Sequence, residues 1–151
     1  PMDPLFPFGH GLSYTEFAYS NLTVSAPPQG RGEVEIAVDV HNAGQRDGDE
    51  VVQLYVGDDV ASIARPAREL KGFLRVSLAA GETTTVRFGL HTDQLAFHNG
   101  AMELCVEPGR FTVMVGASSA DIRLTGSFEL PAGYAVGGDR VYFCRASSGR
   151  D

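Results

Sequence analysis

Acidic residues cluster in the stretch RDGDEVV, residues 46–52, which contains Asp47, Asp49 and Glu50. Carboxylates at this density suggest a calcium-binding loop. An EF-hand loop, however, needs a further oxygen ligand at its fifth position and a glutamate at its twelfth. The fifth residue counted from Asp47 is Val51, so the spacing does not fit. The stretch instead favours a polar turn that leads into a strand.

A second group of residues, His91, Asp93 and His98, could bind a metal ion, since two imidazoles and a carboxylate are common zinc ligands. Nothing in the pattern fixes these side chains on one face of an element. Ser118 and Ser119 follow the stretch VMVG, but no G-x-S-x-G motif of a catalytic serine surrounds them. These residues therefore predict no metal site, no cofactor and no nucleophile.

Paired carboxylates are the groups that hydrolyse glycosides, at a separation of about 5 to 10 Å across a sugar-sized cleft. With 19 Asp and Glu residues, the chain contains many such pairs by chance. No pair is distinguished by its sequence context. We therefore assign no catalytic residue in this chain.

Basic residues gather in the stretch ARPARELKGF, where Arg65, Arg68 and Lys71 lie within seven positions. One interpretation is a solvated loop. The other is a contact with a neighbour that carries carboxylates, which guanidinium groups bind through two parallel hydrogen bonds. The sequence leaves both interpretations open.

The composition limits the partners that such residues could serve. The net charge of −7 argues against nucleic acid and anionic membranes, because both are bound through clustered Lys and Arg. No apolar run is long enough to span a bilayer, and no secretory signal pattern is present, so the signal of an exported parent protein would lie upstream of Pro1. Cys105 and Cys144 could form one disulfide or remain two unrelated thiols.

Alternation of apolar and polar residues is the main structural signal, and it is typical of half-buried strands. It is present in residues 33–44, 49–59, 68–78, 83–90, 110–118 and 121–130. A further strand at residues 16–26 changes parity, which predicts a bulge near Ser20-Asn21. No long segment has the 3.6-residue apolar period of a helix. About eight short strands predict an all-β, immunoglobulin-like sandwich of two sheets.

Two turn signals make this prediction more specific. The dipeptide Asn-Gly at 99–100 predicts a two-residue hairpin that pairs Phe97 with Met102 and Leu95 with Leu104. The stretch EPGR predicts a type II turn with proline and glycine at its central positions 108 and 109.

Five stretches together are similar to a known family: PLFPFGHGLSYTEFAYSNL, NAGQRDGDEVVQLYV, RPARELKGF, LAAGETTTVRF and VEPGRFTVMVGASSADIRLTGSFEL. Their residues, order and spacing over positions 4–130 resemble the C-terminal fibronectin type III-like domain of glycoside hydrolase family 3, which includes β-glucosidases and β-xylosidases. The resemblance implies that the catalytic aspartate and glutamate lie in preceding domains, and neither has a counterpart here. It also implies a parent that is often secreted or periplasmic and sometimes cytoplasmic.

The resemblance implies an interdomain joint at residues 1–15 and a fibronectin type III-like sandwich at 16–130. Residues 131–151, which are rich in glycine and have no clear pairing pattern, predict a C-terminal appendage or tail. The expected partners are the catalytic domains of the same polypeptide, and oligosaccharide is a further candidate at the rim of the cleft. The candidate interdomain contacts are Phe6, Phe8, His10, Tyr14, Arg65, Arg68 and Lys71.

Two other hypotheses remain. The chain could be a free-standing module that binds carbohydrate or protein, although sugar platforms use exposed Trp and Tyr rings and this chain has no Trp and five Tyr. It could also be a small enzyme, which would require a carboxylate pair in a real pocket with one raised pKa.

Overall fold

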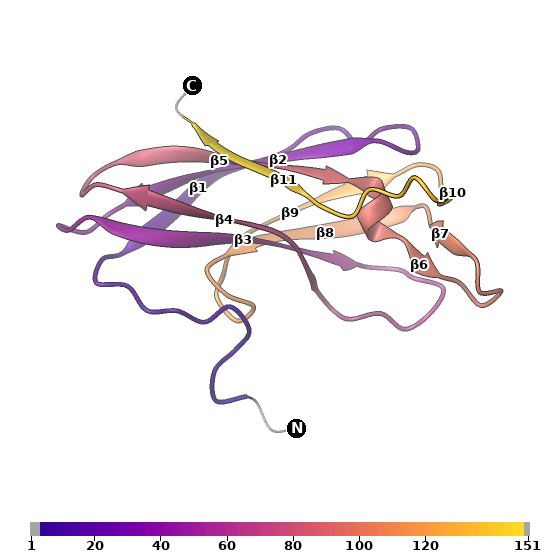
Figure 1. Cartoon of the computed structure of the whole chain (residues 1–151), viewed down its shortest axis with the longest axis horizontal. Coiled ribbons are helices and arrows are strands. Elements are labelled where there is room, and N and C mark those ends of the chain that lie inside the picture. Colours follow the sequence, from indigo (N-terminus) through magenta and orange to yellow (C-terminus); the bar gives the residue numbers. More distant parts are fainter. Residues whose placement is uncertain (1–3, 150–151) are drawn as a thin grey trace.

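The computed structural model describes residues 4–149, so the extreme ends of the predicted joint and tail lie outside the described residues. Two four-stranded antiparallel sheets face each other, with strand orders β1-β2-β5-β11 and β4-β3-β8-β9 (Figure 1). A small third sheet has the order β10-β7-β6. The prediction of an all-β, two-sheet sandwich is confirmed.

The first sheet comprises β1 (Phe17–Val24), β2 (Glu33–Asn42), β5 (Thr83–His91) and β11 (Arg145–Gly149). The second comprises β3 (Gly48–Asp58), β4 (Glu69–Leu78), β8 (Gly109–Gly116) and β9 (Ile122–Leu130). The small sheet comprises β6 (Phe97–His98), β7 (Leu104–Val106) and β10 (Tyr134–Ala135). Within residues 4–149 the helical content is one 3-10 turn, η1 (Thr92–Leu95), and no helix there is long and apolar enough to cross a membrane.

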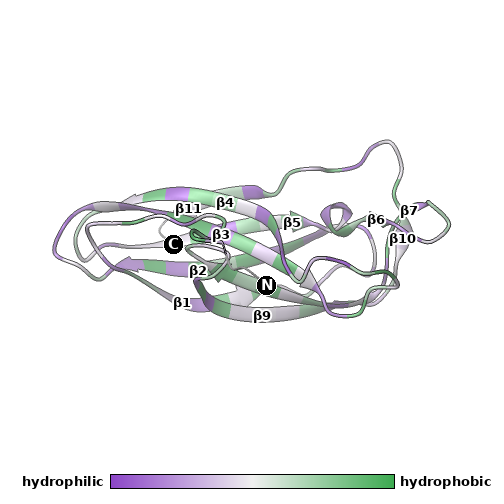
Figure 2. Cartoon of the chain, turned by 90° about the horizontal axis from the view of Figure 1, so that it is seen from below, coloured by the Kyte–Doolittle hydropathy of each residue, from purple (hydrophilic) through white to green (hydrophobic). Residues whose placement is uncertain are grey.

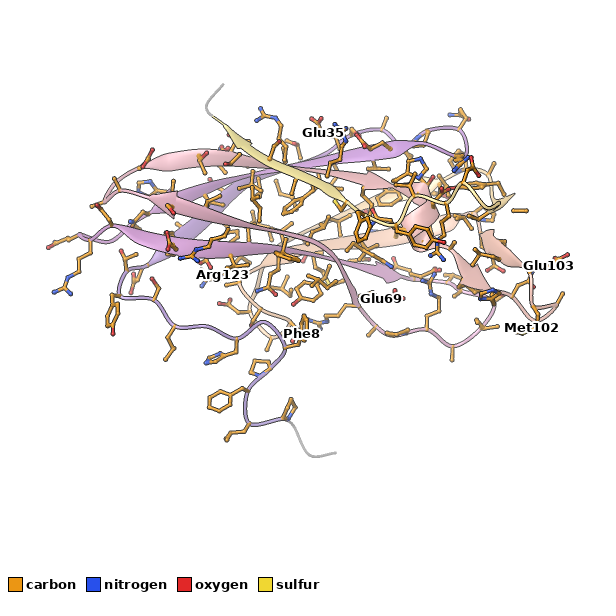
Figure 3. The ribbon with its side chains drawn as sticks, viewed as in Figure 1. Phe8, Glu35, Glu69, Met102, Glu103 and Arg123 are labelled. Atoms are coloured by element: carbon orange, nitrogen blue, oxygen red, sulfur yellow. The ribbon has the colours of Figure 1, made fainter. Side chains whose placement is uncertain are left out.

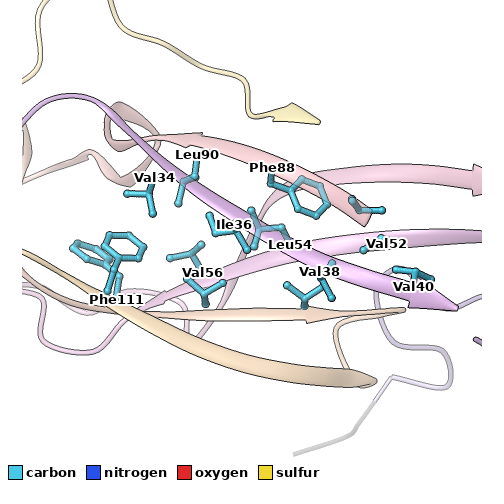
Figure 4. Packing of buried hydrophobic residues seen from close by; sticks show 14 of the residues in the cluster. Val34, Ile36, Val38, Val40, Val52, Leu54, Val56, Phe88, Leu90 and Phe111 are labelled. Atoms are coloured by element: carbon cyan, nitrogen blue, oxygen red, sulfur yellow. The ribbon is translucent and has the colours of Figure 1, made fainter. Parts of the chain in front are cut away.

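The core lies between the two large sheets, where alternate side chains of each strand point inward. The four alternate residues of β2 that the sequence assigns to one face, Val34, Ile36, Val38 and Val40, are fully buried. They meet residues of the opposite sheet such as Leu54, and Phe111 stacks on Phe128 at a centroid distance of 5.3 Å (Figure 4). Hydrophobic and hydrophilic residues accordingly alternate along the ribbons in Figure 2.

The strand register shifts at three places, in β1, in β4 and in β9, where Val115 pairs with Leu124 and Gly116 with Ile122 and Arg123 is the extra residue. The bulge predicted in β1 is confirmed: the register with β2 shifts between Ser20 and Thr23, and Asn21 has a φ of 53°. A second bulge, in β4, was not predicted. Leu54 pairs with Gly72 and Tyr55 with Leu70, which leaves Lys71 as the extra residue. A bulge turns a side chain away from the regular alternation of a strand, and here it redirects Lys71.

The predicted hairpin register at Asn-Gly is wrong. Phe97 pairs with Cys105 and His98 with Leu104, so the loop has five residues rather than two. The side chain of Asn99 is the physical reason, because its Oδ1 accepts hydrogen bonds from the backbone N–H groups of Ala101 and Glu103 at 2.9 and 3.0 Å. These bonds stabilise a wider loop.

The predicted type II turn at EPGR is also wrong. Gly109 has a φ of 152°, whereas the third residue of a type II turn needs about +80°. Strand β7 pairs with β6 and β10, while β8 pairs with β3 and β9. The stretch is therefore an extended connection from the small sheet to the large one.

The segment after residue 130 contributes two strands. β10 pairs with β7, and β11 pairs with β5 over Arg145–Gly149. β11 also lies beside β4 of the other sheet, and at the opposite side β1 lies beside β9. The tail therefore helps to close one side of the sandwich (Figure 1).

Candidate functional site

The N-terminal joint is bound to the sandwich through its backbone. The carbonyl oxygen of Phe8 accepts a hydrogen bond from the N–H of Ser119 at 2.9 Å, and that of Gly9 accepts one from Nε2 of Gln53 at 3.2 Å. Further along, the Thr15 hydroxyl donates to Oδ1 of Asn42 at 2.7 Å. The joint is thus held against the sandwich at Phe8, Gly9 and Thr15.

The apolar side chains of this joint point away from the sandwich. Leu5, Phe6, Phe8, Leu12 and Tyr14 have 66 to 95% of their surface exposed. Figure 3 shows Phe8 on the N-terminal segment, outside the two sheets. The joint is tied to the sandwich at Phe8, Gly9 and Thr15 while these apolar side chains are uncovered, which is the pattern expected of a surface that another body covers.

Glycine is required at position 9. Its φ is +78°, in the left-handed region that side chains disfavour, and a Cβ placed there would lie 2.2 Å from Oε1 of Gln53. The turn also carries the ring of Phe6 next to that of His10, with centroids 5.4 Å apart. Of the predicted joint residues, these two lie together.

Gln53 and Tyr55 are buried, although the alternation of β3 places them on its outer face. Nε2 of Gln53 donates to Gly9 and to the carbonyl oxygen of Ala117 at 2.7 Å, and the Tyr55 hydroxyl donates to Oε1 of Gln53 at 2.5 Å. These hydrogen bonds of Gln53 and Tyr55 therefore link the joint, β3 and the β8–β9 loop. The strand pattern alone could not reveal them, because the covering segments are distant in sequence.

A cavity of about 610 Å³ lies between the joint and the sandwich and includes Glu50, Asp121 and Arg123 in its lining. Burial raises the pKa of Glu50, and this effect exceeds the opposing effects of the Val51 N–H and Arg123. The pKa of Asp121 is lowered by hydrogen bonds from Arg123, whose Nε lies 2.6 Å from Oδ1. Figure 3 labels Arg123 at this place in the fold.

The cavity does contain carboxyl groups with opposite pKa shifts, which is the arrangement that a small enzyme would need. The two carboxylates with lowered pKa are, however, engaged by arginines: Asp121 by Arg123, and Asp49 by Arg75 and the hydroxyl of Ser77. Both carboxylates therefore already have cationic partners within this chain. The joint, which forms one wall of the cavity, is a more distinctive feature of this surface than the carboxyl groups are.

The three basic residues of ARPARELKGF separate into two groups. Arg65 and Lys71 are mostly buried, with 9% and 11% of their side chains exposed, and both bind Glu69, at 3.0 and 2.8 Å. Arg65 also pairs with Asp58 at 3.2 Å and donates to the carbonyl oxygen of Leu95 at 3.0 Å. These two cations are therefore paired within this chain.

Arg68 differs because it is exposed and lies beside the joint. Its Nη1 donates to the carbonyl oxygen of Ser119 at 2.5 Å, and the N–H of the same Ser119 binds the joint at Phe8. Of the three basic residues, Arg68 is the one that the structure brings next to the predicted joint residues.

Asp93, which the sequence suggested as a metal ligand, is a fully buried anion with several donors. Arg31 binds it through Nε and Nη2, at 3.1 and 2.8 Å, and it also accepts hydrogen bonds from the Tyr134 hydroxyl and the Val141 N–H, both at 2.9 Å. His91 Nδ1 lies 3.5 Å from its Oδ2.

Among residues 4–149 no group of three or more His, Cys, Asp or Glu is arranged to hold a metal ion. Cys105 and Cys144 are free thiols, and burial raises the pKa of Cys144 to about 11. The candidate site of this chain is thus the joint and the surface around it.

Comparison with known proteins agrees with the fold. The family model described as a fibronectin type III-like domain matches residues 50–119. A periplasmic beta-glucosidase of Salmonella typhimurium is 46% identical over 84% of this chain, and a beta-xylosidase of Formosa agariphila is 50% identical over 77%. These matches span 17% and 16% of the two proteins, so the chain covers about one sixth of the length of these curated relatives.

Solved structures give the same result. Beta-glucosidase 3B from Thermotoga neapolitana, in complex with alpha-D-glucose, superposes with a TM-score of 0.83 and 37% sequence identity, covering 89% of this chain and 18% of that one. The sandwich therefore is a fibronectin type III-like domain. It belongs, more particularly, to the fibronectin type III-like domains of glycoside hydrolase family 3.

Proposed function

We propose that this chain is the non-catalytic C-terminal accessory domain of a family 3 glycoside hydrolase and packs on the catalytic domains of the same polypeptide. The parent would hydrolyse terminal β-glycosidic bonds, as a β-glucosidase or β-xylosidase. The observation that carries the proposal is the joint, which hydrogen bonds at Phe8 and Gly9 hold to the sandwich and which presents five uncovered apolar side chains.

The energetics of the joint support this role. Burying a large apolar side chain contributes about 1.5 to 3 kcal/mol. A neighbouring domain that covers several of these side chains would therefore be held by a substantial favourable free energy. The relatives named beta-glucosidase and beta-xylosidase contain this domain within chains about six times longer, which supports a covering body in the same polypeptide.

Arg68 and the cavity beside the joint extend the proposed contact surface. The guanidinium group of Arg68 keeps exposed donors that a carboxylate of the neighbouring domain could accept. Glu50, at the cavity wall, would be removed further from water by a covering domain. The contacts of Phe6, Phe8, His10 and Tyr14 with that domain are part of the same proposal.

The test is to locate the enzyme activity and the chain together. An antibody raised against residues 4–149 is used on extracts of the source organism, and the same gel is stained for hydrolysis of aryl β-glucosides and β-xylosides. We expect a band several times heavier than 16.1 kDa that carries the activity, while the isolated chain hydrolyses neither substrate. A single inactive band near 16.1 kDa would contradict the proposal.

A further inference from the structure

A second cavity, of about 480 Å³, lies away from the joint, where the segment before β11 crosses β4 and η1. Figure 1 shows this yellow segment passing in front of η1. Lys71, Gln94 and Arg140 contribute polar groups to its lining, and Phe73 and the pair Tyr142-Phe143 contribute rings.

Gln94 brings an unused acceptor to this cavity. Its side chain is buried, with 7% of the residue exposed. Its Nε2 donates to the carbonyl oxygens of Lys71 and Tyr142, at 3.4 and 3.3 Å. Carbonyl oxygens only accept, so the amide cannot be reversed, and Oε1 is left without a hydrogen-bond partner among residues 4–149.

Arg140 brings an unused donor to the same wall. Its Nε is buried and has no hydrogen-bond partner in the described part of the chain. The guanidinium group lies over the ring of Tyr142, 5.1 Å from the centroid. A buried acceptor and a buried donor without hydrogen-bond partners lower the stability of the fold. A ligand that supplies the missing hydrogen bonds would therefore recover this free energy on binding.

The rim of the cavity is aromatic and exposed. Phe73, Tyr142 and Phe143 have 63, 64 and 84% of their surface exposed. Exposed rings beside planar amide and guanidinium groups match the chemistry of a pyranose, which has an apolar face and hydroxyl groups around its edge. A hydroxyl group can donate to Gln94 and accept from Arg140, which no simple anion or apolar ligand can do.

We propose that this cavity is a binding site for a neutral pyranoside, with the sugar stacked on Tyr142 or Phe143 and its hydroxyl groups bound by Gln94 and Arg140. The two unsatisfied atoms are closed to solvent, so binding includes a change of rotamer. Arg140 is the side chain able to make it, because stacking rather than hydrogen bonding holds its guanidinium group, and in the proposal this movement also opens Oε1 of Gln94, whose amide stays in place through its two hydrogen bonds. The site is independent of the proposed interdomain role.

The experiment is an NMR titration of the 15N-labelled 151-residue chain with methyl β-D-glucopyranoside and methyl β-D-xylopyranoside. We expect saturable shifts at residues 71–73, 94 and 140–144, with a dissociation constant on the order of millimolar, as suits so small a ligand. Phe143→Ala and Tyr142→Ala should weaken binding, about fivefold to tenfold for the ring that carries the sugar. Arg140→Lys should also weaken it, since lysine lacks Nε.

Tyr14→Ala is the matched control, because Tyr14 is an exposed ring far from the cavity in sequence, on the joint. It should bind as the native chain does. The proposal is overturned if neither glycoside gives saturable shifts at tens of millimolar, or if acetate and glucuronate shift these residues while the neutral glycosides do not. It is also overturned if the same residues shift on raising protein concentration alone, which would place a second copy of the chain there.

Discussion

Asp93 shows how one buried side chain can link segments that are far apart in the sequence. Its carboxylate joins η1 to Arg31 in the β1–β2 loop, to Tyr134 in β10 and to the backbone at Val141. Burial alone would raise the pKa of Asp93, but these donors outweigh it and lower the pKa to about 2, from an ordinary value of 3.8. The ionised form is therefore the one that the fold stabilises.

Asp93→Asn should lower the free energy of unfolding at pH 7 by about 2 kcal/mol, since the lowered pKa is itself a measure of that stabilisation. The contribution of the ionised Asp93 to the free energy of unfolding is fully present above pH 3.8 and is lost as the pH falls towards 2. The native chain and the variant should therefore have equal stability near pH 2. Urea unfolding over this pH range measures the difference. Asp139→Asn, at the exposed partner of Arg31, is the control and should have a much smaller effect.

Glu50 should show the opposite pH dependence. Its raised pKa means that the fold disfavours the ionised carboxylate. The free energy of unfolding is therefore highest below the ordinary glutamate pKa, and it falls as the pH rises through the raised pKa of Glu50. We expect Glu50→Gln to be more stable than the native chain at neutral pH and equal to it in acid. Thermal unfolding at several pH values checks this, with the exposed Glu129→Gln as a control. A variant less stable at neutral pH would contradict the role of burial.

At the scale of elements, alternation predicts every strand of the two large sheets except β11, because the burial of one face of a strand produces a local apolar-polar alternation in the sequence. The parity change at Ser20-Asn21 likewise predicted a bulge. β10 and β11 were not predicted, since they have two and five residues and depend on pairing with β7 and β5, far away in the sequence. The hairpin register was wrong because the Asn99 side chain, not the Asn-Gly backbone, determines that loop.

The candidate site was predicted in part. The apolar joint was visible in the sequence because proline, glycine and aromatic residues without a period fit no strand or helix. The pairing of Arg65 and Lys71 with Glu69 was not visible, since the bulge at Lys71 and the position of η1 arise only in the folded chain. The buried contact of Gln53 with Gly9 was hidden for the same reason.

The joint offers a test at the scale of one element. Gly9→Ala places a Cβ against Gln53 and forces alanine to a φ of +78°, so we expect the joint to detach locally, with a loss of about 1 to 3 kcal/mol. The amide of Ser119, which donates to Phe8, should then exchange faster with solvent. Gly11→Ala is the matched control, since a Cβ there meets nothing within 4 Å. Equal exchange in both variants would mean that Gly9 does not hold the joint.

At the scale of the whole molecule, the proposal predicts that joint side chains stabilise the parent polypeptide more than they stabilise this chain. The double variant Phe6→Ser and Phe8→Ser should lower the melting temperature of the parent by several degrees, because each buried ring contributes about 1.5 to 3 kcal/mol. The isolated chain should change little, since both rings are 66% exposed in it. Val60→Ser, at an apolar residue exposed elsewhere, is the control in both backgrounds.

The most direct measurement is hydroxyl-radical footprinting of the joint in the isolated chain and in the parent polypeptide. Tyr14 and the two phenylalanines at positions 6 and 8 are compared with Met102, which is 77% exposed on the β6–β7 loop (Figure 3). The account predicts that labelling of the three joint rings falls severalfold in the parent, as expected of an interface that covers them. Equal labelling of the joint in the two proteins would contradict the claim that this domain packs on its catalytic neighbours through the N-terminal joint.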